Sequence, residues 1–587
     1  METILGIDLG TTNSVVAIIR DGKPEVLMDD DGQAILPSVV GLDAHGNVLV
    51  GQAARNQAIL APDRTVTSVK RRMGEDVQLP LGASAFTPQE ISSLILKTLK
   101  DRAQRRLGYA VEKAVITVPA FFGENQREAT REAGVLAGLE VVRIINEPTA
   151  ASLTYEANQS SRETLLVYDL GGGTFDVSVV QIEDGVVEVL ASHGDTRLGG
   201  DDFDRLLLDK VCAAFHQEHA LDLREIVVAR SRLLQAVERT KCELSFEAYA
   251  SLQEEFIASK QGRPLNLETV IDRSDYEVLI EPLLKKTIDS VDRALSDAKL
   301  HAKDIDKVLL VGGATRTPLI HHLLEEQLGQ QPHSELDPDL CVALGAAIQG
   351  ALIAGIDVGP VLVDITPKTL GVRCLGQLHG LVTNRVFSPI IHRNTALPAT
   401  RSRLYYTAVP GQEVAQIDVY QGEHEDIQLN ELVGKFNLEG LNEAADMGNE
   451  ILVRFELSLD GTLNVTATER ATAQKKQLSI DNAITRFRAS SHDQAKQKLA
   501  QLFAADTASL RTDQDAEQST AEARKQALGP RCERGQELMA KAERLSGSAT
   551  DEDANEIRTL VERLTAAITK GLPERIDELS DKLEDVL

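Results

Sequence analysis

Two short segments of the chain combine aspartate, glycine and threonine in a pattern suited to a phosphorylated ligand. They are residues 8–14 (DLGTTNS) and residues 169–176 (DLGGGTFD). Each follows an apolar run and precedes another, which predicts a strand, a tight turn and a second strand, with an aspartate at the end of the first strand. Glycine lets backbone N–H groups approach an anion, and a turn gathers several of these donors into one concavity.

The aspartates that begin these segments, Asp8 and Asp169, would repel a polyphosphate placed directly against them. A hydrated Mg²⁺ between them removes this conflict, because Mg²⁺ prefers carboxylates, phosphate oxygens and water. Either segment alone could be an ordinary tight hairpin. The matched pair indicates two similar lobes that close on one ligand.

A third glycine-containing segment, residues 311–316 (VGGATR), follows the apolar run 307–310. It predicts a close approach of the backbone to a nucleoside, with Arg316 free to stack on a base. The sequence contains no G-x-x-x-x-G-K-[ST] motif, so it is not a P-loop protein.

The elements that must position these segments follow from the hydrophobic pattern. Residues 1–356 alternate short apolar strands with amphipathic helices, for example residues 114–118 and residues 124–136, which predicts an α/β domain. Residues 357–364 have the length and the Gly359-Pro360 pair of a linker.

The rest of the chain changes its period twice. Residues 365–489 alternate with a period of two, most clearly on either side of Asp460-Gly461, which predicts an antiparallel β domain with a type I′ hairpin turn. Residues 490–587 have helical apolar stripes, and Thr550 is a candidate helix cap. The expected fold class is multidomain, α/β followed by β and then α.

Composition excludes several classes of function. The 587 residues carry a formal net charge of −28, and aromatic residues make up 4% with no tryptophan. A polyanion would be repelled and stacking platforms are scarce, so we expect no nucleic-acid binding. The five cysteines form no C-x-x-C pair, which favours a reducing compartment over disulfides or zinc. The longest apolar stretch, residues 341–356, is too short to span a bilayer, so we expect a soluble cytoplasmic protein that binds no membrane.

Four motifs resemble those of the DnaK-type chaperones, the 70-kDa heat-shock family. They are residues 6–14, residues 146–151 (NEPTAA), residues 169–176 and residues 194–204. The resemblance runs from residue 4 to about residue 480. It implies an actin-like (ribonuclease H-like) ATPase domain at 1–356, an interdomain linker at 357–364, a β-sandwich peptide-binding domain at 365–489 and a helical lid at 490–587.

The function that the resemblance implies is an ATP-dependent molecular chaperone. Such a protein hydrolyses ATP to ADP and phosphate, at a slow basal rate, to control the binding and release of unfolded or extended polypeptides. A J-domain co-chaperone is an implied partner, and the sequence leaves open whether a nucleotide exchange factor is needed. The implied ligands are ATP or ADP and Mg²⁺, with K⁺ as a further candidate ion.

Carried over by position, the resemblance assigns roles around the nucleotide. Asp8 and Asp169 would hold the metal through water, and Lys70 would stabilise the γ-phosphoryl group as it leaves. The implied catalytic residues are Lys70, Glu147, Asp169 and Thr174. The implied nucleotide-binding residues are Gly10, Thr11, Thr12, Asn13, Gly172, Gly173, Thr174, Glu238, Lys241, Ser245, Gly312, Gly313, Arg316 and Asp339.

The resemblance also assigns residues to coupling and to peptide binding. The implied coupling residues between nucleotide and peptide domain are Pro119, Arg127, Arg143 and Asp364. In the β domain, Leu375 and Ala408 would form an arch over the peptide, and the implied pocket residues are Val372, Tyr405, Ala415 and Ile417. The family usually has valine where this chain has Ala415, so the pocket would be wider, unless Ala415 only packs in the sandwich.

Besides Gly359-Pro360 in the linker, where the family usually has Asp-Val, the chain departs from a typical DnaK in three further places. Residues 74–87 are a much shortened segment, residues 385–395 (RVFSPIIHRNT) lie in an apparent insertion of the β domain, and the helical tail is short. Together these features resemble the specialised HscC subgroup.

Two other classes of function remain open from the sequence. A small-molecule kinase such as a sugar kinase can use the same cleft, although it would need its acceptor site there rather than in an appended sandwich. A non-catalytic nucleotide sensor or a filament protein is the second alternative. The joint presence of Asp8, Lys70, Glu147, Asp169 and Thr174 favours hydrolysis over both.

Overall fold

The computed structural model describes residues 2–155, 162–333, 337–356, 358, 361–409, 411–442, 448–459, 462–472, 475–479, 499, 534–542, 544, 557–561, 563–565 and 573–586. The chain divides into two compact units, Met1–Leu499 and Ala500–Leu587. Gly359-Pro360 of the linker, the Asp460-Gly461 turn and the cap at Thr550 lie outside the described residues, as does the domain boundary expected at residue 490.

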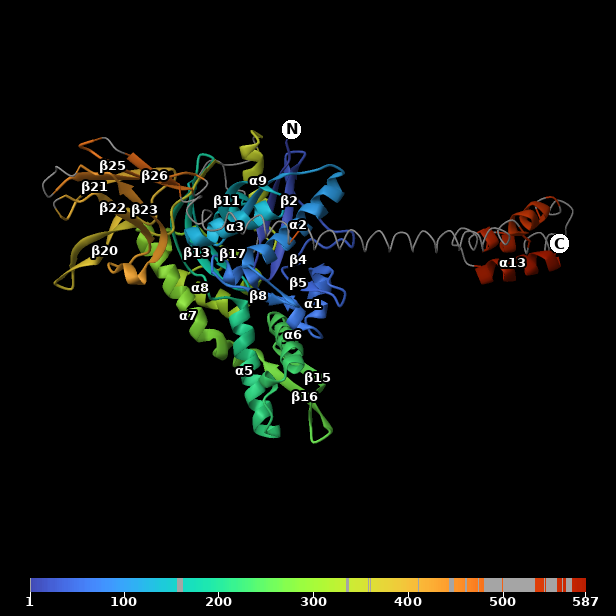
Figure 1. Ribbon diagram of the computed structural model, residues 1–587. Helices are drawn as coiled ribbons and strands as arrows, with labels where there is room; N and C mark the ends of the chain where they lie inside the picture. Colours follow the sequence, from blue (N-terminus) through green and yellow to red (C-terminus); the bar gives the residue numbers. More distant parts are fainter. Residues whose placement is uncertain are drawn as a thin grey trace. The chain divides into compact units, whose positions relative to one another are not determined.

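Two sheets of the first unit repeat one arrangement, in which an antiparallel hairpin is flanked by a parallel strand. Figure 1 labels β2 and β11 of the first sheet and β13 and β17 of the second. The first sheet has the order β11-β10-β1-β2-β3, with β4 (Leu36–Pro37) beside β2. Its strands are β1 (Ile4–Leu9), β2 (Asn13–Arg20), β3 (Lys23–Val26), β10 (Lys113–Val118) and β11 (Glu140–Asn146). The repeat confirms the two similar lobes that the matched segments predict.

The second sheet has the order β17-β12-β13-β14-β18. Its strands are β12 (Glu163–Leu170), β13 (Phe175–Glu183), β14 (Val186–Asp195), β17 (Lys307–Val311) and β18 (Val361–Val363). The last of these belongs to the linker, whose residues pair in parallel with the start of β14. Asp8 and Asp169 each occupy the next-to-last position of the first hairpin strand in their sheet.

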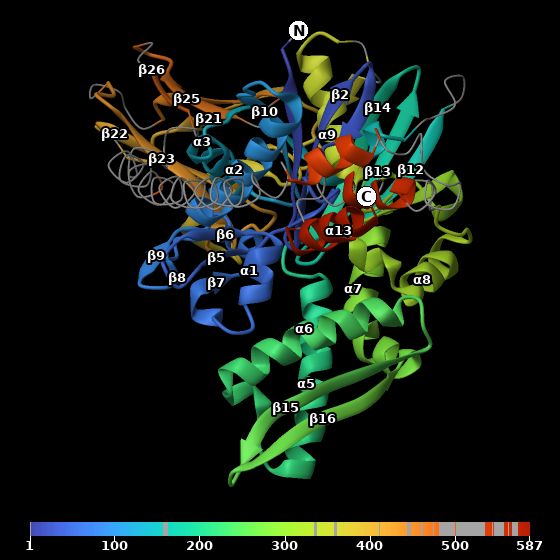
Figure 2. The same cartoon turned by 90° about the vertical axis from the view of Figure 1, so that its right-hand side faces the viewer.

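Helices cover these sheets and extend the second lobe. Long helices are α2 (Pro88–Leu107), α3 (Glu124–Leu136), α5 (Gly200–His219), α6 (Val227–Leu244), α7 (Arg273–Ala298), α8 (Pro318–Leu328) and α9 (Cys341–Ile353). Figure 2 shows α5 and α6 beside the hairpin of β15 (Tyr249–Lys260) and β16 (Arg263–Asp272), and α6 packs on β15. The start of α2 follows directly from local sequence, because Thr87 and Glu90 form a capping box before a proline in the first turn.

The first lobe also carries small sheets around the short helix α1 (Gln52–Gln57). One sheet joins β5 (Val40–Leu42), β6 (Val48–Val50) and β7 (Thr65–Val66). The shortened segment noted in the sequence forms a two-stranded hairpin, β8 (Leu79–Leu81) and β9 (Ser84–Phe86), immediately before α2.

Helix α9 packs against β1, β2, β10 and the short helix α4 (Glu147–Leu153). Its sequence, CVALGAAIQGALI, consists mostly of small residues, and nearly all of it is buried. A Cβ on Gly345 would lie 1.8 Å from the carbonyl oxygen of Ala150, and a Cβ on Gly6 would lie 2.1 Å from the backbone nitrogen of Ala347. Backbone therefore touches backbone here, which only glycine permits.

A β-sandwich follows the linker: the period-two pattern predicts its antiparallel strands, and the resemblance implies the sandwich. One sheet has the order β20-β19-β22-β23 and the other β21-β24-β25-β26. Their strands are β19 (Leu370–Leu378), β20 (Leu381–Ile391), β21 (Ala399–Tyr406), β22 (Val414–Gln421), β23 (Glu431–Glu439), β24 (Glu450–Leu457), β25 (Leu463–Glu469) and β26 (Lys475–Ser479). The apparent insertion becomes strand: residues 385–391 continue β20, so the extra length extends the β19–β20 hairpin.

In the second unit, the described helical residues are 534–542, 544, 557–561, 563–565 and α13 (Pro573–Val586). Their apolar stripes pack together, since Leu538, Leu560, Leu564, Ile576 and Leu583 share one core. The helical apolar stripes expected within residues 490–587 are thus confirmed where the structure describes those residues. Among the described residues, no helix combines the length and apolar character that a membrane span requires.

The contact between α4 and α9 gives a test of the fold. Gly345→Ala places a methyl group against a backbone carbonyl, and we expect it to lower the free energy of unfolding by about 1–3 kcal/mol, the usual cost of overpacking. Gly350→Ala in the same helix is the matched control, because its nearest neighbours include movable side-chain atoms of Ile4 at 3.0 and 3.2 Å. Denaturant unfolding measures the difference between the two variants. Equal denaturant midpoints for Gly345→Ala and Gly350→Ala would contradict this account.

Candidate functional site

The two glycine-containing turns face each other. A Cβ on Gly172 would lie 1.9 Å from Thr12 Oγ1, and a Cβ on Gly173 would lie 2.7 Å from Thr11 Cγ2. A Cβ on Gly199, at the start of α5, would lie 2.5 Å from the carbonyl carbon of Gly172. The two turns are therefore in contact across the lobes, and any side chain in place of these glycines would fill the space where backbone N–H groups can meet an anion.

Acidic side chains gather behind the turns. Burial and the charge of Glu147 raise the pKa of Asp8 to about 7, against the opposing effects of Lys70 and of the Thr117 hydroxyl, which donates to Asp8 Oδ1 over 2.8 Å. Burial, followed by the charges of Glu147, Asp176 and Asp8, raises the pKa of Asp169 well above its usual range. The charge of Asp8 thus acts on Asp169, so the two aspartates lie near each other, as the matched segments predict.

Lys70 supplies the opposite charge. It lies in η2 (Val69–Arg72), is 3% exposed, and its ammonium is paired with the Glu147 carboxylate at the start of α4. The ammonium also lies 5.9 Å from the centre of the Phe122 ring. A buried cation tied to a buried carboxylate is far from the solvated surface lysine that three adjacent basic residues would suggest.

Residues expected around a nucleoside lie at one end of the same cleft. Lys241 of α6 pairs with Asp204 of α5 over 2.7 Å, and Glu238 pairs with Arg55 over 2.6 Å, while Ser245 caps the end of α6. A Cβ on Gly312 would lie 2.4 Å from the carbonyl oxygen of Leu170, which ties the third glycine segment to the second turn.

Arg316 differs from its expected role in one respect. Its guanidinium is paired with Asp339 over 2.6 Å and lies 3.7 Å from Asp337, so it is held rather than free. The side chain remains 41% exposed. Gly313 lies near the same carboxylate, because a Cβ added at this glycine would be 3.1 Å from Asp339 Oδ1.

The expected coupling residues converge between the acidic cavity and the linker. Asp176 accepts from the backbone N–H groups of Ala120 and Phe121, over 3.1 and 3.0 Å, immediately after Pro119. Arg127 donates to the carbonyl of Ala120 over 3.2 Å and to Asn146 Oδ1 over 2.5 Å.

Asn146 then connects this path to the linker. Its amide donates to both carboxylate oxygens of Asp364, over 3.1 and 3.0 Å. Burial raises the pKa of Asp364, although the charges of Arg127 and Arg143 oppose the shift. The hydrogen bonds thus join Arg127 to Asp364 through Asn146, which the sequence did not single out for this role, and the charge of Arg143 acts on Asp364.

The sandwich also contacts both lobes through polar side chains. Arg393 pairs with Asp297 of α7 over 2.8 Å. Asn125 of α3 donates to Glu431 of β23 over 2.5 Å. Polar contacts of this kind join the sandwich to both lobes.

The residues expected at a peptide site divide into two groups. Leu375 is 59% exposed and Ala408 is exposed, as a pair reaching over a groove would be. Val372, Ala415 and Ile417 are buried in the sandwich core, and Tyr405 packs against it with its hydroxyl 2.9 Å from Ser388 Oγ. This burial is compatible with a pocket floor and equally with plain core packing.

Known proteins match the chain along most of its length. A sequence model described as Hsp70 protein matches residues 4–84 and 76–587. Chaperone protein DnaK of Thermotoga neapolitana is 45% identical over 486 residues, covering 82% of this chain and 80% of its own length. The chaperone protein DnaK sequences of Thermotoga petrophila and Thermotoga maritima match to the same extent.

The chain belongs to the Hsp70 family. This agrees with the expected DnaK-type resemblance, and it fits an ATPase domain followed by a β-sandwich. As an Hsp70 protein, it is built for nucleotide binding, and the kinase and sensor alternatives are not favoured.

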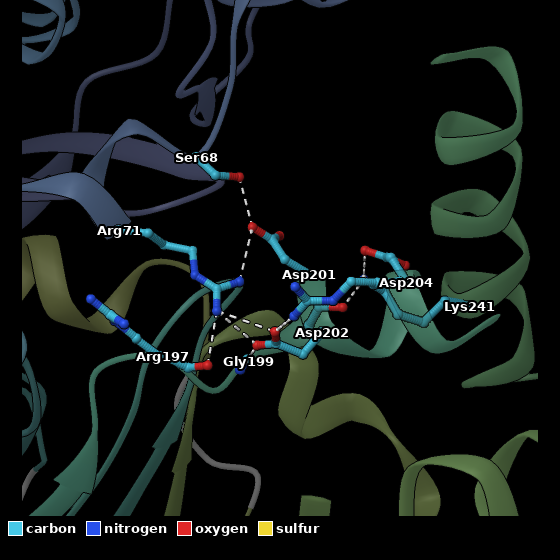
Figure 3. Close-up of polar contacts among 10 residues, drawn as sticks. Ser68, Arg71, Arg197, Gly199, Asp201, Asp202, Asp204 and Lys241 are labelled. Atoms are coloured by element: carbon cyan, nitrogen blue, oxygen red, sulfur yellow. Dashed lines mark hydrogen bonds and ion pairs between the residues drawn. The ribbon is translucent and has the colours of Figure 1, made fainter. Parts of the chain in front are cut away.

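The sequence indicated no individual role for several residues that the structure places at this site. Asp176 closes the second motif and enters the acidic cavity, and Gly199 completes the contact between the turns. Asp201 and Asp202 connect α5 to Ser68 and Arg71 of the other lobe (Figure 3). Asp176, Gly199, Asp201 and Asp202 lie within the motifs named above, so the sequence did mark their segments. Their contacts could not be predicted, because the partner residues are distant in sequence.

The donor set fits a hydrated metal rather than a directly ligated one. Among the described residues, no group of three or more His, Cys, Asp or Glu side chains is placed to ligate a metal ion directly. Asp8 and Asp169 are nevertheless desolvated carboxylates with raised pKa values, which a cation would stabilise in their charged form. Contact through water, as Mg²⁺ prefers, meets both observations.

The raised pKa of Asp8 gives a test with a definite sign. Because the folded-state pKa, about 7, lies above the ordinary value of 3.8, wild-type stability falls as the pH rises between these values. Asp8→Asn should therefore stabilise the ligand-free protein at pH 8, on the order of 1–2 kcal/mol, and the gain should shrink toward pH 4.

Adding magnesium and ATP should reverse the order, because Asp8→Asn loses the charge that a bound cation requires. Thermal unfolding at several pH values, with and without the ligand, measures both effects. A variant less stable than wild type at pH 8 without ligand would contradict the electrostatic account.

Proposed function

We propose that this Hsp70-family protein is an ATP-dependent chaperone that hydrolyses ATP to ADP and phosphate and thereby controls its grip on extended polypeptides. The observation that carries the proposal is the contact between the two glycine turns, with Asp8, Asp169 and the Lys70–Glu147 pair directly behind them. Oriented N–H donors, carboxylates and a buried ammonium in one cleft suit a triphosphate and its charge-neutralising ion.

Each protein group has a defined role in this proposal. The turns at Gly10 to Asn13 and Gly172 to Thr174 bind the phosphates, and Lys70 stabilises negative charge on the phosphoryl group that is cleaved. Glu147 holds Lys70 in place and is available to orient the attacking water. A magnesium ion, held through water by Asp8 and Asp169, would neutralise phosphate charge.

Nucleotide state reaches the peptide domain through direct contacts. Asp176 meets the cleft at one end of the path, and Asp364 lies in the linker next to β18 at the other end. The linker strand pairs with β14, and the sandwich is tied to α7 through Arg393. We infer that these contacts belong to the ATP-bound arrangement, and that ADP favours their release, as in a population shift.

Peptide binding is assigned to one face of the sandwich. Leu375 and Ala408 would cover an extended segment, and Val372, Tyr405, Ala415 and Ile417 would form its pocket. An extended chain offers backbone hydrogen bonds along its length and one apolar anchor, as in strand-addition recognition. The exposure of Leu375 supports this assignment.

The remaining parts of the proposal concern partners, place and subgroup. A J-domain protein would act near Arg143 and Asp364, and unfolded polypeptides would be the clients in a cytoplasmic setting; Mg²⁺ and K⁺ would accompany the nucleotide. The four-part division at 1–356, 357–364, 365–489 and 490–587, with the last part as lid, belongs to the same proposal. The short β8–β9 hairpin and the FSPII residues in β20 support placement in the HscC subgroup.

Removal of the buried ammonium tests the hydrolytic step. Lys70→Ala should lower the single-turnover rate of ATP hydrolysis by about 100-fold or more, because charge on the phosphoryl group loses its nearest cation. Arg72→Gln, in the same 3-10 helix but paired with Glu75 at the surface, is the control and should hydrolyse ATP normally. Unchanged hydrolysis by Lys70→Ala would refute the role given to that lysine.

Truncation of the exposed arch residue tests the peptide site. Leu375→Ala should weaken the binding of a fluorescent apolar heptapeptide in the presence of ADP by about 5–30-fold, since roughly 1–2 kcal/mol of apolar burial is lost. Leu381→Ala is the matched control, because this leucine is 73% exposed at the far tip of the same hairpin. Equal effects of the two variants on anisotropy titrations would argue against an arch at Leu375.

A further inference from the structure

A group of charged side chains joins the two lobes beside the nucleotide turns (Figure 3). Arg71 lies in η2 and Ser68 directly precedes this helix, in the lobe that contains β1. Asp201 and Asp202 come from the first turn of α5, in the lobe that contains β12. None of these four side chains belongs to the catalytic set assigned above.

Arg71 makes the central contacts of the group. Its Nη2 atom donates to Asp202 Oδ2 and Oδ1 over 3.0 and 3.2 Å and to the carbonyl of Arg197 over 2.8 Å. Beside it, the Ser68 hydroxyl donates to Asp201 Oδ2 over 2.6 Å. The two lobes are therefore joined here by an ion pair and by further hydrogen bonds.

Burial makes this pair different from an ordinary surface ion pair. The Arg71 side chain is 19% exposed and the Asp202 side chain 7%. Charge-assisted bonds of arginine to a shielded carboxylate are stronger than exposed pairs, whose contribution is about 0–1 kcal/mol. Asp202 is also fixed from its own side, because it accepts from the backbone N–H of Gly199 over 2.9 Å and pairs with Arg205.

The position of Arg71 connects three parts of the site. It follows Lys70 directly, and a Cβ on Gly173 would lie 2.8 Å from Arg71 Cγ, so its stem lies against the second phosphate turn. On the far side, α5 is joined to α6 by Lys241, which bonds Asp204 over 2.7 Å and the carbonyl of Gly200 over 3.3 Å. A continuous set of contacts thus runs from Arg71, next to Lys70, through α5 to α6, which carries the expected nucleotide-binding residues Glu238 and Lys241.

We propose that Arg71 is a positioning residue that keeps the lobes closed on bound nucleotide and thereby slows ADP release. The inference rests on the nucleotide site proposed above. Opening of the cleft would separate η2 from α5 and break the bonds to Asp202, Asp201 and Arg197 together. Loss of the Arg71 guanidinium lowers the free energy needed for that opening, so ADP is released faster. The residues of the phosphate-binding turns are unchanged.

The test measures dissociation of a fluorescent ADP analogue from the full chain by stopped flow, with excess unlabelled ADP as competitor. Arg71→Gln and Asp202→Asn should each accelerate release about tenfold. The double variant should release no faster than about the faster single variant, because both remove one shared interaction. Arg71→Lys keeps the positive charge but loses the planar guanidinium, and it should give an intermediate rate of ADP release.

Arg72→Gln is the matched control, since Arg72 pairs with Glu75 within its own lobe over 2.5 Å. The inference is overturned if Arg71→Gln and Asp202→Asn release ADP at the wild-type rate, if Arg72→Gln accelerates release equally, or if the effects of the two partners simply add. Should Arg71→Gln fail to fold, Asp202→Asn decides alone, because asparagine can still accept at the helix start. Failure of the wild-type chain to bind the analogue at all would instead overturn the proposed nucleotide function.

Discussion

Repulsion among buried carboxylates is the constraint on which this structure depends. Asp8, Asp169, Asp176 and Glu147 share one cavity, and burial together with their mutual charge raises the pKa values of the three aspartates. Lys70 offsets part of this repulsion, yet one ammonium cannot balance the cluster. Protonation or a bound cation would each relieve this repulsion, and the two glycine turns beside the cluster carry backbone N–H groups suited to a polyanion.

The same constraint explains why contacts lead away from the cavity. Asp176 is held by the N–H groups of Ala120 and Phe121, and the loop that supplies them is held in turn by Arg127. Asn146 and Asp364 complete a continuous set of hydrogen bonds to the linker. This set of bonds connects Asp176, which lies among the buried carboxylates, to Asp364 of the linker. The route uses backbone groups and buried side chains, so it has little freedom to absorb a shift.

Local patterns predicted the elements with good accuracy where one physical rule dominated. The helix expected at residues 124–136 is α3 (Glu124–Leu136), because its amphipathic stripe packs on the sheet. The matched turns and the period-two strands were also predicted, since both depend on neighbours in sequence. The apparent insertion at 385–395 was less informative, because only pairing with β19 turns residues 385–391 into strand. Arg316 was expected to be free, and its pairing with Asp339 depends on a residue 23 positions away.

The sequence by itself determined the chemistry of this protein: the aspartates, glycines and threonines of two matched turns, the family to which they belong, and the change from α/β to β to α. These follow from residue types and short-range periodicity. Only the tertiary structure decided which groups face one another. The burial of Lys70 against Glu147, the path from Asp176 to Asp364 and the Arg71–Asp202 bridge join segments that lie 77, 188 and 131 positions apart. Such contacts depend on how two lobes and a sandwich pack, and the free energy of that packing is shared among many residues rather than encoded at any one of them.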